Sequence, residues 1–198
     1  VGDAMATTIW GASSSWTLTA LPLFVWMGEI LFRTKLSENL FKGLAPWMQR
    51  LPGGLIHVNV VGCALFAAIS GSSAATVATV GKMSIPELRK RKYPEKILLG
   101  SLAGSGTLGL LIPPSIILII YGVTVQESIA KLFIAGIIPG IMIALIFMSY
   151  VIVWSLINKK SMPKSNENSS FLEKVKKSKQ LMPVVLLILA VIGSIYTG

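Results

Sequence analysis

Long apolar stretches, separated by short segments rich in lysine and arginine, dominate the chain. The apolar stretches cover residues 17–32, 56–85, 97–125, 132–157 and 181–196. A helix needs about 20 apolar residues to cross the roughly 30 Å hydrocarbon core of a bilayer. Each stretch therefore predicts a membrane-embedded helix or helix pair, and the chain is expected to be an all-α polytopic membrane protein.

Residues 35–50 differ from these stretches because apolar and polar positions alternate with helical spacing. Apolar residues recur at intervals of three and four, with Lys42 and Arg50 between them. This pattern predicts an amphipathic helix that lies at the membrane interface and ends at the Pro-Gly-Gly of residues 52–54. The apolar positions are Leu36, Leu40, Phe41, Leu44, Trp47, Met48 and Leu51.

Composition narrows the class of protein. Of the 198 residues, 53% are hydrophobic and only 13% are charged, whereas a soluble domain carries roughly 25% charged residues. An ordinary soluble domain and a disordered chain are therefore excluded. The net charge of +10 does not indicate a nucleic-acid partner, because a polar nucleic-acid face would not accompany a mean hydropathy of +0.73. The single Cys63 and single His57 exclude a disulfide scaffold and a multi-residue Cys/His metal site.

The basic residues fall into three groups, which the positive-inside rule places together in the cytoplasm. The stretch 56–85 connects the first group to the second, so it must enter and leave the membrane on the same side. The sequence therefore predicts a re-entrant helical hairpin, with its tip among the small residues 68–76. The three groups lie within residues 33–50, 82–96 and 159–179, with Lys131 apart from them.

The stretch 97–125 is interrupted near its middle by glycines and by Pro113-Pro114. Prolines remove backbone donors, and the carbonyls left unpaired cannot face lipid, so they must be buried in protein or line a polar cavity. Such carbonyls suit a small cation such as Na⁺, and helix N-termini that begin after a break suit a carboxylate. Paired discontinuities at the hairpin tip and at residues 104–114 indicate a transporter binding site. Close helix packing through the same small residues is the alternative.

Other candidate motifs give weaker indications. Gly104-x-Gly106-x-x-Gly109 matches a dinucleotide-binding fingerprint as a string, but no βαβ unit surrounds it. No phosphate-binding P-loop and no Ser-His-Asp arrangement is visible, so no enzyme is expected. Glu29 lies four residues before Arg33, which favours a local helix pair, with a coupling carboxylate as the alternative.

Several short motifs follow one another in a specific order. They are Leu51-Pro52-Gly53-Gly54-Leu55, Asn59-Val60-Val61, Ile69-Ser70-Gly71-Ser72-Ser73-Ala74, Ile85-Pro86-Glu87, Tyr93-Pro94, Gly109, Ile112-Pro113-Pro114-Ser115, Tyr121-Gly122-Val123 and Leu132-Phe133-Ile134-Ala135-Gly136-Ile137-Ile138-Pro139-Gly140. Together they resemble the large membrane subunit of tripartite ATP-independent periplasmic (TRAP) transporters. The resemblance extends over residues 3–157 and weakens beyond them.

The resemblance implies an elevator-type secondary transporter in the bacterial inner membrane, built from inverted repeats and driven by Na⁺. It implies import of organic acids such as sialic acid or C4-dicarboxylates. The implied partners are a small four-helix membrane subunit and a soluble periplasmic binding protein. Na⁺ would be held mainly by backbone oxygens, with the substrate nearby. Carried onto this chain, the Na⁺ residues are Ser70, Ser72, Gly109, Ile112 and Pro114, and the substrate residues are Ser73 and Thr107.

The expected organisation follows the chain from scaffold to transport region. A scaffold-type helix and the interfacial helix occupy residues 1–50, and a transport-type region with the hairpin and broken helix occupies 51–135. A return helix at 136–158, a basic cytoplasmic linker at 159–180 and the start of a second repeat at 181–198 follow. The resembled subunits are about twice as long, so a first half is expected. Two alternatives stay open: an elevator-type anion carrier without a binding protein, and a membrane structural or assembly subunit.

Overall fold

Helices account for all the regular secondary structure of the described residues. The computed structural model describes residues 2–14, 19–163 and 171–197, and no strand occurs among them. This confirms the all-α prediction. Residues 15–18, in the expected first span and its N-terminal extension, and 164–170 in the expected linker lie outside the described residues.

The first part of the chain forms three helices, α1 (Gly2–Ser13), α2 (Ala20–Phe32) and α3 (Leu36–Met48). The amphipathic pattern predicted the third helix correctly. Its apolar face is buried because it packs against the next two helices, whereas Lys42 on the other side is exposed. The buried apolar residues of α3 are Leu36, Leu40, Phe41 and Leu44.

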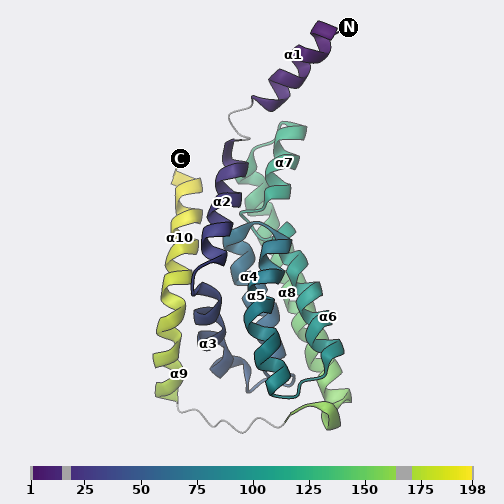
Figure 1. The fold of residues 1–198 in the computed structure, drawn as a ribbon, viewed down its shortest axis with the longest axis vertical. Coiled ribbons are helices and arrows are strands. Elements are labelled where there is room, and N and C mark those ends of the chain that lie inside the picture. The colour runs from purple at the N-terminus through teal and green to yellow at the C-terminus, as the bar shows by residue number, and fades with distance from the viewer. Residues whose placement is uncertain (1, 15–18, 164–170, 198) are drawn as a thin grey trace.

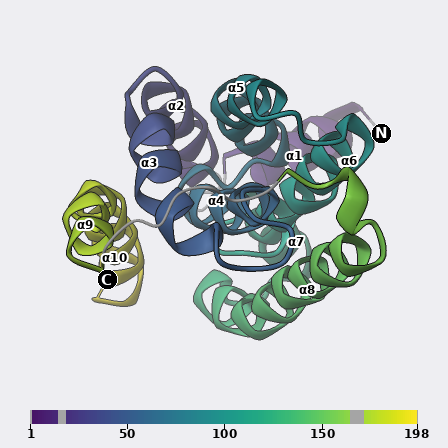
Figure 2. The ribbon, with the colours of Figure 1, turned by 90° about the horizontal axis from the view of Figure 1, so that it is seen from below.

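The stretch 56–85 forms a helical hairpin, as its small-residue middle predicted. Helices α4 (Ile56–Ser70) and α5 (Ser73–Lys90) run antiparallel and are joined by Gly71 and Ser72. Seen from below, α4 lies at the centre of the bundle with α3, α5, α6 and α8 around it (Figure 2). Helix α4 is apolar around most of its circumference, which suits its contacts with protein on all sides. Its largest side chain, Phe66, is fully buried.

A broken helix follows the hairpin. Helix α6 (Glu95–Gly106) continues into the 3₁₀ turn η2 (Thr107–Leu110), and α7 (Ile116–Val125) starts only after an irregular segment that contains the cis Pro113-Pro114 bond. The interruption therefore falls where the glycines and prolines predicted it.

The long helix α8 (Ile129–Ile157) runs beside the broken helix (Figure 1). Its 29 residues correspond to about 44 Å. Within the described residues it is the one helix that is both long and apolar enough to cross a bilayer, and three shorter apolar helices accompany it. Much of its surface is exposed and apolar, as expected of a face that contacts lipid; this face includes Ile134, Ile138, Ile141, Leu145, Val153 and Ile157.

The C-terminal part contains a helix that the polar sequence of the linker did not predict. After the turn η3 (Lys159–Ser161), α9 (Phe171–Ser178) and the turn η4 (Lys179–Leu181) lead into α10 (Met182–Thr197). Helices α9 and α10 form one edge of the bundle beside α3 (Figure 2).

Both open ends of the hairpin lie at one end of the molecule. The start of α4, the end of α5, the start of α6 and the end of α8 gather at the lower end in Figure 1, whereas the hairpin tip lies near the middle of the bundle. Members of all three basic groups belong to this end of the bundle, since Arg50 follows the end of α3, Lys90 ends α5 and Lys159 follows α8.

Candidate functional site

The hairpin tip depends on one glycine in a left-handed conformation. Gly71 has a φ of 61° and ends α4, and its N–H donates to the Ala67 carbonyl at 3.1 Å. Ser72 then adopts an extended conformation and caps α5, because its hydroxyl accepts the Ala75 N–H at 3.4 Å. A left-handed glycine followed by a serine cap reverses the chain within these two residues.

Buried hydroxyl groups connect the two sides of the tip. The Thr76 hydroxyl donates to the Ser72 carbonyl at 2.7 Å, and its oxygen lies 2.9 Å from the Ser70 hydroxyl oxygen. The Ser70 oxygen also accepts the Ser72 N–H at 3.4 Å. Ser70 and Thr76 are almost completely buried, so these bonds replace the water that the hydroxyl groups lose on folding.

The irregular segment of the broken helix leaves several backbone carbonyls without hydrogen bonds. The Leu108 carbonyl accepts two N–H groups, and the Ser115 hydroxyl donates to the Leu110 carbonyl at 2.8 Å. The two prolines that follow Ile112 carry no N–H. In the described part of the chain, no hydrogen bond reaches the carbonyl oxygens of residues 111–114. The sequence predicted such unpaired carbonyls, and the structure confirms them.

The tip packs directly against the break. The Ile116 N–H, at the start of α7, donates to the Gly71 carbonyl at 3.2 Å. A methyl group added to Gly71 would lie 2.7 Å from the Pro114 carbonyl oxygen, and one added to Gly109 would lie 2.9 Å from the Ser73 nitrogen. Both glycines are therefore required for this close backbone approach, which joins the two discontinuities that the sequence singled out.

The other side of the break packs against α8 in a similar way. A methyl group added to Gly136 would lie 2.6 Å from the Leu111 carbonyl oxygen, and one added to Gly140 would lie 2.8 Å from the Ile112 side chain. These two glycines are four residues apart, so they lie on one face of the helix. The irregular segment is therefore held between the hairpin tip and α8.

The residues expected to hold Na⁺ gather in this region. Ser70 and Ser72 belong to the tip, Gly109 contacts the tip, and Pro114 contacts Gly71. The side chain of the fifth residue, Ile112, packs toward α8.

The two residues expected near a substrate differ in exposure. The Ser73 hydroxyl oxygen is buried, and it has no hydrogen-bond partner among the residues that the structure describes. The Thr107 side chain is exposed and donates to the Gly104 carbonyl at 2.7 Å. The structure therefore places Ser73 against the break, through Gly109, and Thr107 at the surface of η2.

Sequence reasoning included Thr76 in the tip without giving it a role, and it missed the polar contacts between α4 and α6. Thr76 follows Ser72 by four residues, a spacing that brings a threonine hydroxyl to the carbonyl one turn earlier. Asn59 donates from Nδ2 to the Leu98 carbonyl at 3.2 Å and to the Ser101 hydroxyl at 3.0 Å. These bonds fix α4 against α6 below the tip, and Asn59 was quoted only as part of a motif.

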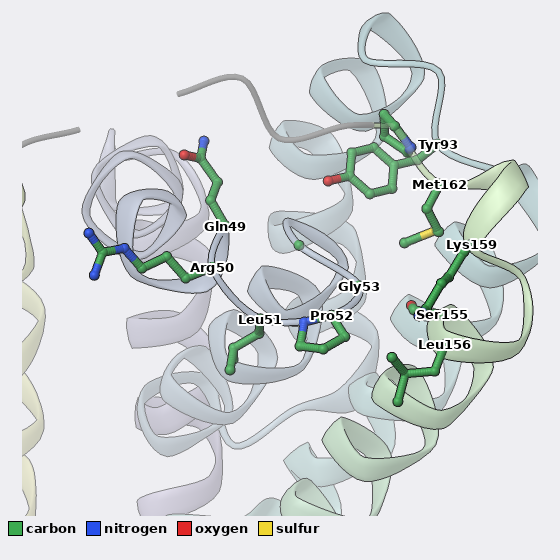
Figure 3. Close-up of a pocket in the computed structure, with 12 residues that line it drawn as sticks. Gln49, Arg50, Leu51, Pro52, Gly53, Tyr93, Ser155, Leu156, Lys159 and Met162 are labelled. Atoms are coloured by element: carbon green, nitrogen blue, oxygen red, sulfur yellow. The ribbon is translucent and has the colours of Figure 1, made fainter. Parts of the chain in front are cut away.

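A cavity of about 400 Å³ lies at the open end of the hairpin rather than at its tip. Figure 3 shows Tyr93, Ser155 and Lys159 around the turn at Gly53, with the Arg50 side chain directed away from them. The Tyr93 hydroxyl oxygen accepts the Leu55 N–H at 3.1 Å, and burial raises the pKa of Tyr93. The length of α4, about 22 Å, separates this cavity from the tip.

Replacement of Thr76 by valine should destabilise the tip by about 1–3 kcal/mol, because it removes a buried donor to the Ser72 carbonyl and a partner of Ser70. Thr124→Val provides the control, since the Thr124 side chain is exposed and bonds only within its own helix, to the Ile120 carbonyl. Thermal unfolding of the complete polypeptide in detergent measures both variants. Equal stability of the two would contradict a structural role for the Thr76 hydroxyl.

Comparison with known proteins gives a consistent result over the whole chain. The family model described as "Tripartite ATP-independent periplasmic transporter, DctM component" matches residues 1–198. The C4-dicarboxylate TRAP transporter large permease protein DctM of Pseudomonas aeruginosa is 34% identical over 195 residues, which are 98% of this chain and 45% of that protein.

Two further relatives are named for other solutes. The sialic acid TRAP transporter large permease protein SiaM of Vibrio cholerae is 34% identical over 95% of this chain and 43% of its own length. The ectoine/5-hydroxyectoine TRAP transporter large permease protein UehC of Ruegeria pomeroyi is 32% identical over 92% of this chain and 42% of its own length. The chain therefore spans less than half the length of these relatives.

All three relatives are named as transporter permeases, which confirms that the chain is not an enzyme. The match of the family model to every residue and the identities above 30% agree with the motif series and the all-helical fold. The chain belongs to the DctM family of large permease components of TRAP transporters.

Proposed function

We propose that the complete protein is a Na⁺-coupled permease that imports an organic acid delivered by a periplasmic binding protein. The observation that carries this proposal is the contact between the hairpin tip and the break, where carbonyl oxygens accept no hydrogen bond within the described residues and that of Pro114 lies against Gly71. Such carbonyls need a partner. In transporters, the carbonyls of unwound backbone coordinate a small cation.

The proposed Na⁺ ligands are oxygens of the tip and the break. Ser70 and Ser72 would contribute from the tip, and Gly109, Ile112 and Pro114 from the break. Support comes from the Pro114 carbonyl, which lies against Gly71, and from the Ile112 carbonyl, which accepts no hydrogen bond within the described residues. No cluster of His, Cys, Asp or Glu that could hold a metal occurs in that part of the chain, so the proposed ligands are uncharged oxygens.

An organic acid would bind beside this cation. Helix α5 begins at Ser73 and α7 begins at Ile116, and the two starts are adjacent because the Ile116 N–H bonds to the Gly71 carbonyl. Helix N-termini carry partial positive charge and favour a carboxylate. The unpartnered Ser73 hydroxyl supports a substrate contact, and Thr107 would approach the substrate from η2. C4-dicarboxylates, sialic acid and ectoine, the solutes in the relatives' names, all contain a carboxylate.

The proposed topology places the basic lower end in the cytoplasm of a bacterial inner membrane. The hairpin would then enter from the cytoplasm and return to it, so that its tip reaches the middle of the bilayer. Transport would follow an elevator mechanism in which this region moves across the membrane. The family description, a tripartite transporter component, supports a small membrane subunit and a periplasmic binding protein as the partners.

Uptake by the complete transporter in liposomes tests this proposal. The complete permease, its small subunit and its binding protein are reconstituted, and radiolabelled C4-dicarboxylate or sialic acid is offered under an inward Na⁺ gradient. Uptake should occur with Na⁺ and fall to the level of empty liposomes when K⁺ replaces Na⁺. Unchanged uptake in K⁺ would contradict Na⁺ coupling, and uptake without the binding protein would contradict its delivery role.

A further inference from the structure

A groove separate from the hairpin tip opens between α3, α5 and the segment formed by α9 and η4. Its volume is about 360 Å³, which falls within the range of roughly 300–1,000 Å³ typical of small-molecule sites. The groove is lined by Phe41, Lys42, Ala45, Pro46 and Gln49 of α3 and its end, by Met83, Glu87 and Arg91 of α5 and its end, and by Lys177 and Gln180.

Specific contacts hold the third wall of the groove in place. The Trp47 indole N–H donates to the Ser178 hydroxyl at 2.8 Å, and Lys174 lies 6.0 Å from the centre of the Trp47 ring. The Leu181 side chain occupies the space beside Gly43, where any larger residue would collide with it. Helix α9 and η4 therefore form a defined wall against α3.

The groove combines an apolar floor with a cationic rim. Phe41 is buried in the floor, and Ala45 and Met83 extend it. The rim carries the cationic side chains of Lys42, Arg91 and Lys177 and a single carboxylate, that of Glu87.

Two of the cationic side chains at the rim form ion pairs. Glu87 holds the Arg91 guanidinium at 2.8 Å, so the arginine is fixed at the groove. Lys42 forms an ion pair with Glu38 on the exposed side of α3. The hydrogen bond within this pair lowers the pKa of the Glu38 carboxyl. With Glu38 included, three cationic side chains (Lys42, Arg91 and Lys177) stand against two carboxylates (Glu38 and Glu87), so the groove keeps an excess of positive charge.

We propose that this groove binds an anionic phospholipid, with its phosphate headgroup at the cationic rim and the upper part of an acyl chain on the apolar floor. The charge of the rim matches a phosphodiester, and the apolar floor matches a lipid rather than a free anion. The position also fits, since α3 is the amphipathic helix whose pattern indicates the membrane interface. Basic pockets between helices at this level bind anionic headgroups. The lipid would bridge α3, α5 and α9, three segments distant in the sequence.

Native mass spectrometry of the complete polypeptide in detergent, titrated with phosphatidylglycerol or phosphatidylcholine, tests the proposal. The double variant Lys42→Gln/Lys177→Gln should bind phosphatidylglycerol roughly tenfold more weakly or worse, because two rim charges are lost. Lys42 is a suitable position because its ion pair is exposed and contributes little to stability. Lys90→Gln/Lys176→Gln is the matched control, since both lysines are exposed on α5 and α9 but lie outside the groove.

Three results would overturn the proposal. Equal weakening in both double variants would indicate diffuse charge attraction instead of a site. Equal binding of phosphatidylcholine and phosphatidylglycerol would exclude recognition of the anionic headgroup. Displacement of phosphatidylglycerol by millimolar inorganic phosphate would identify a free anion as the occupant. Retention of phosphatidylglycerol by the control, its loss in the groove variant and its resistance to phosphate would support the lipid.

Discussion

Replacement of Gly71 by alanine should abolish solute uptake and destabilise the hairpin by roughly 2–5 kcal/mol. Two effects add at this position. The φ of 61° is unfavourable for any residue with a Cβ atom, and the new methyl group would lie 2.7 Å from the Pro114 carbonyl oxygen. The methyl group is attached directly to the backbone of the tip, and the Pro114 oxygen belongs to the backbone of the break. The contact can therefore be relieved only by separating the tip from the break.

Gly62→Ala is the matched control for Gly71→Ala because Gly62 lies in α4, the helix that Gly71 ends. A methyl group at Gly62 would make only an ordinary contact, 3.6 Å to Val80. Alanine favours a helix over glycine by up to about 1 kcal/mol, so this variant should be unchanged or slightly more stable. Thermal unfolding and reconstituted uptake measure both variants. Normal uptake by Gly71→Ala would show that the tip and the break do not need this contact for transport.

Gly109→Ala should produce the second largest effect, with a loss of about 1–3 kcal/mol in stability and a fall in uptake of about tenfold or more. Its methyl group would lie 2.9 Å from the Ser73 nitrogen and 3.0 Å from the Ser72 carbonyl carbon. The apparent affinity for Na⁺ should fall as well, because the displaced atoms belong to the proposed cation site.

Gly100→Ala controls for the general effect of alanine on the broken helix. A methyl group at Gly100 would contact nothing within 4 Å, so stability, uptake and Na⁺ affinity should stay at or above those of the unchanged protein. If Gly109→Ala behaved like Gly100→Ala, the close packing of the tip on the break would have no functional consequence.

The sequence predicted the two discontinuities because their chemistry is local. Small residues at 70–73 reverse the chain, and Pro113-Pro114 removes two backbone donors, whatever the rest of the fold does. The same local reasoning predicted α3 from its apolar spacing. The proposed role of these discontinuities in binding Na⁺ and substrate stays a prediction.

The features that were missed depend on contacts between distant segments. Helix α9 lies in a polar, lysine-rich stretch, and its packing depends on the bond between Trp47 and Ser178, which are far apart in the sequence. The pairing of Asn59 with Ser101 depends equally on how α4 and α6 are arranged. Single-sequence patterns contain no information about such partners, because they report periodicity within one element only.

The contacts of Gly136 and Gly140 with the irregular segment link α8 mechanically to the hairpin. The Leu111 carbonyl oxygen lies close to the α8 backbone at Gly136, and the Ile112 side chain lies close to it at Gly140, which leaves little room for α8 to slide along the broken helix. In the proposed elevator motion, the hairpin, the broken helix and this part of α8 would therefore move together. The boundary between the moving and the stationary parts in that proposal would then pass through other surfaces, such as those facing α2 and α3.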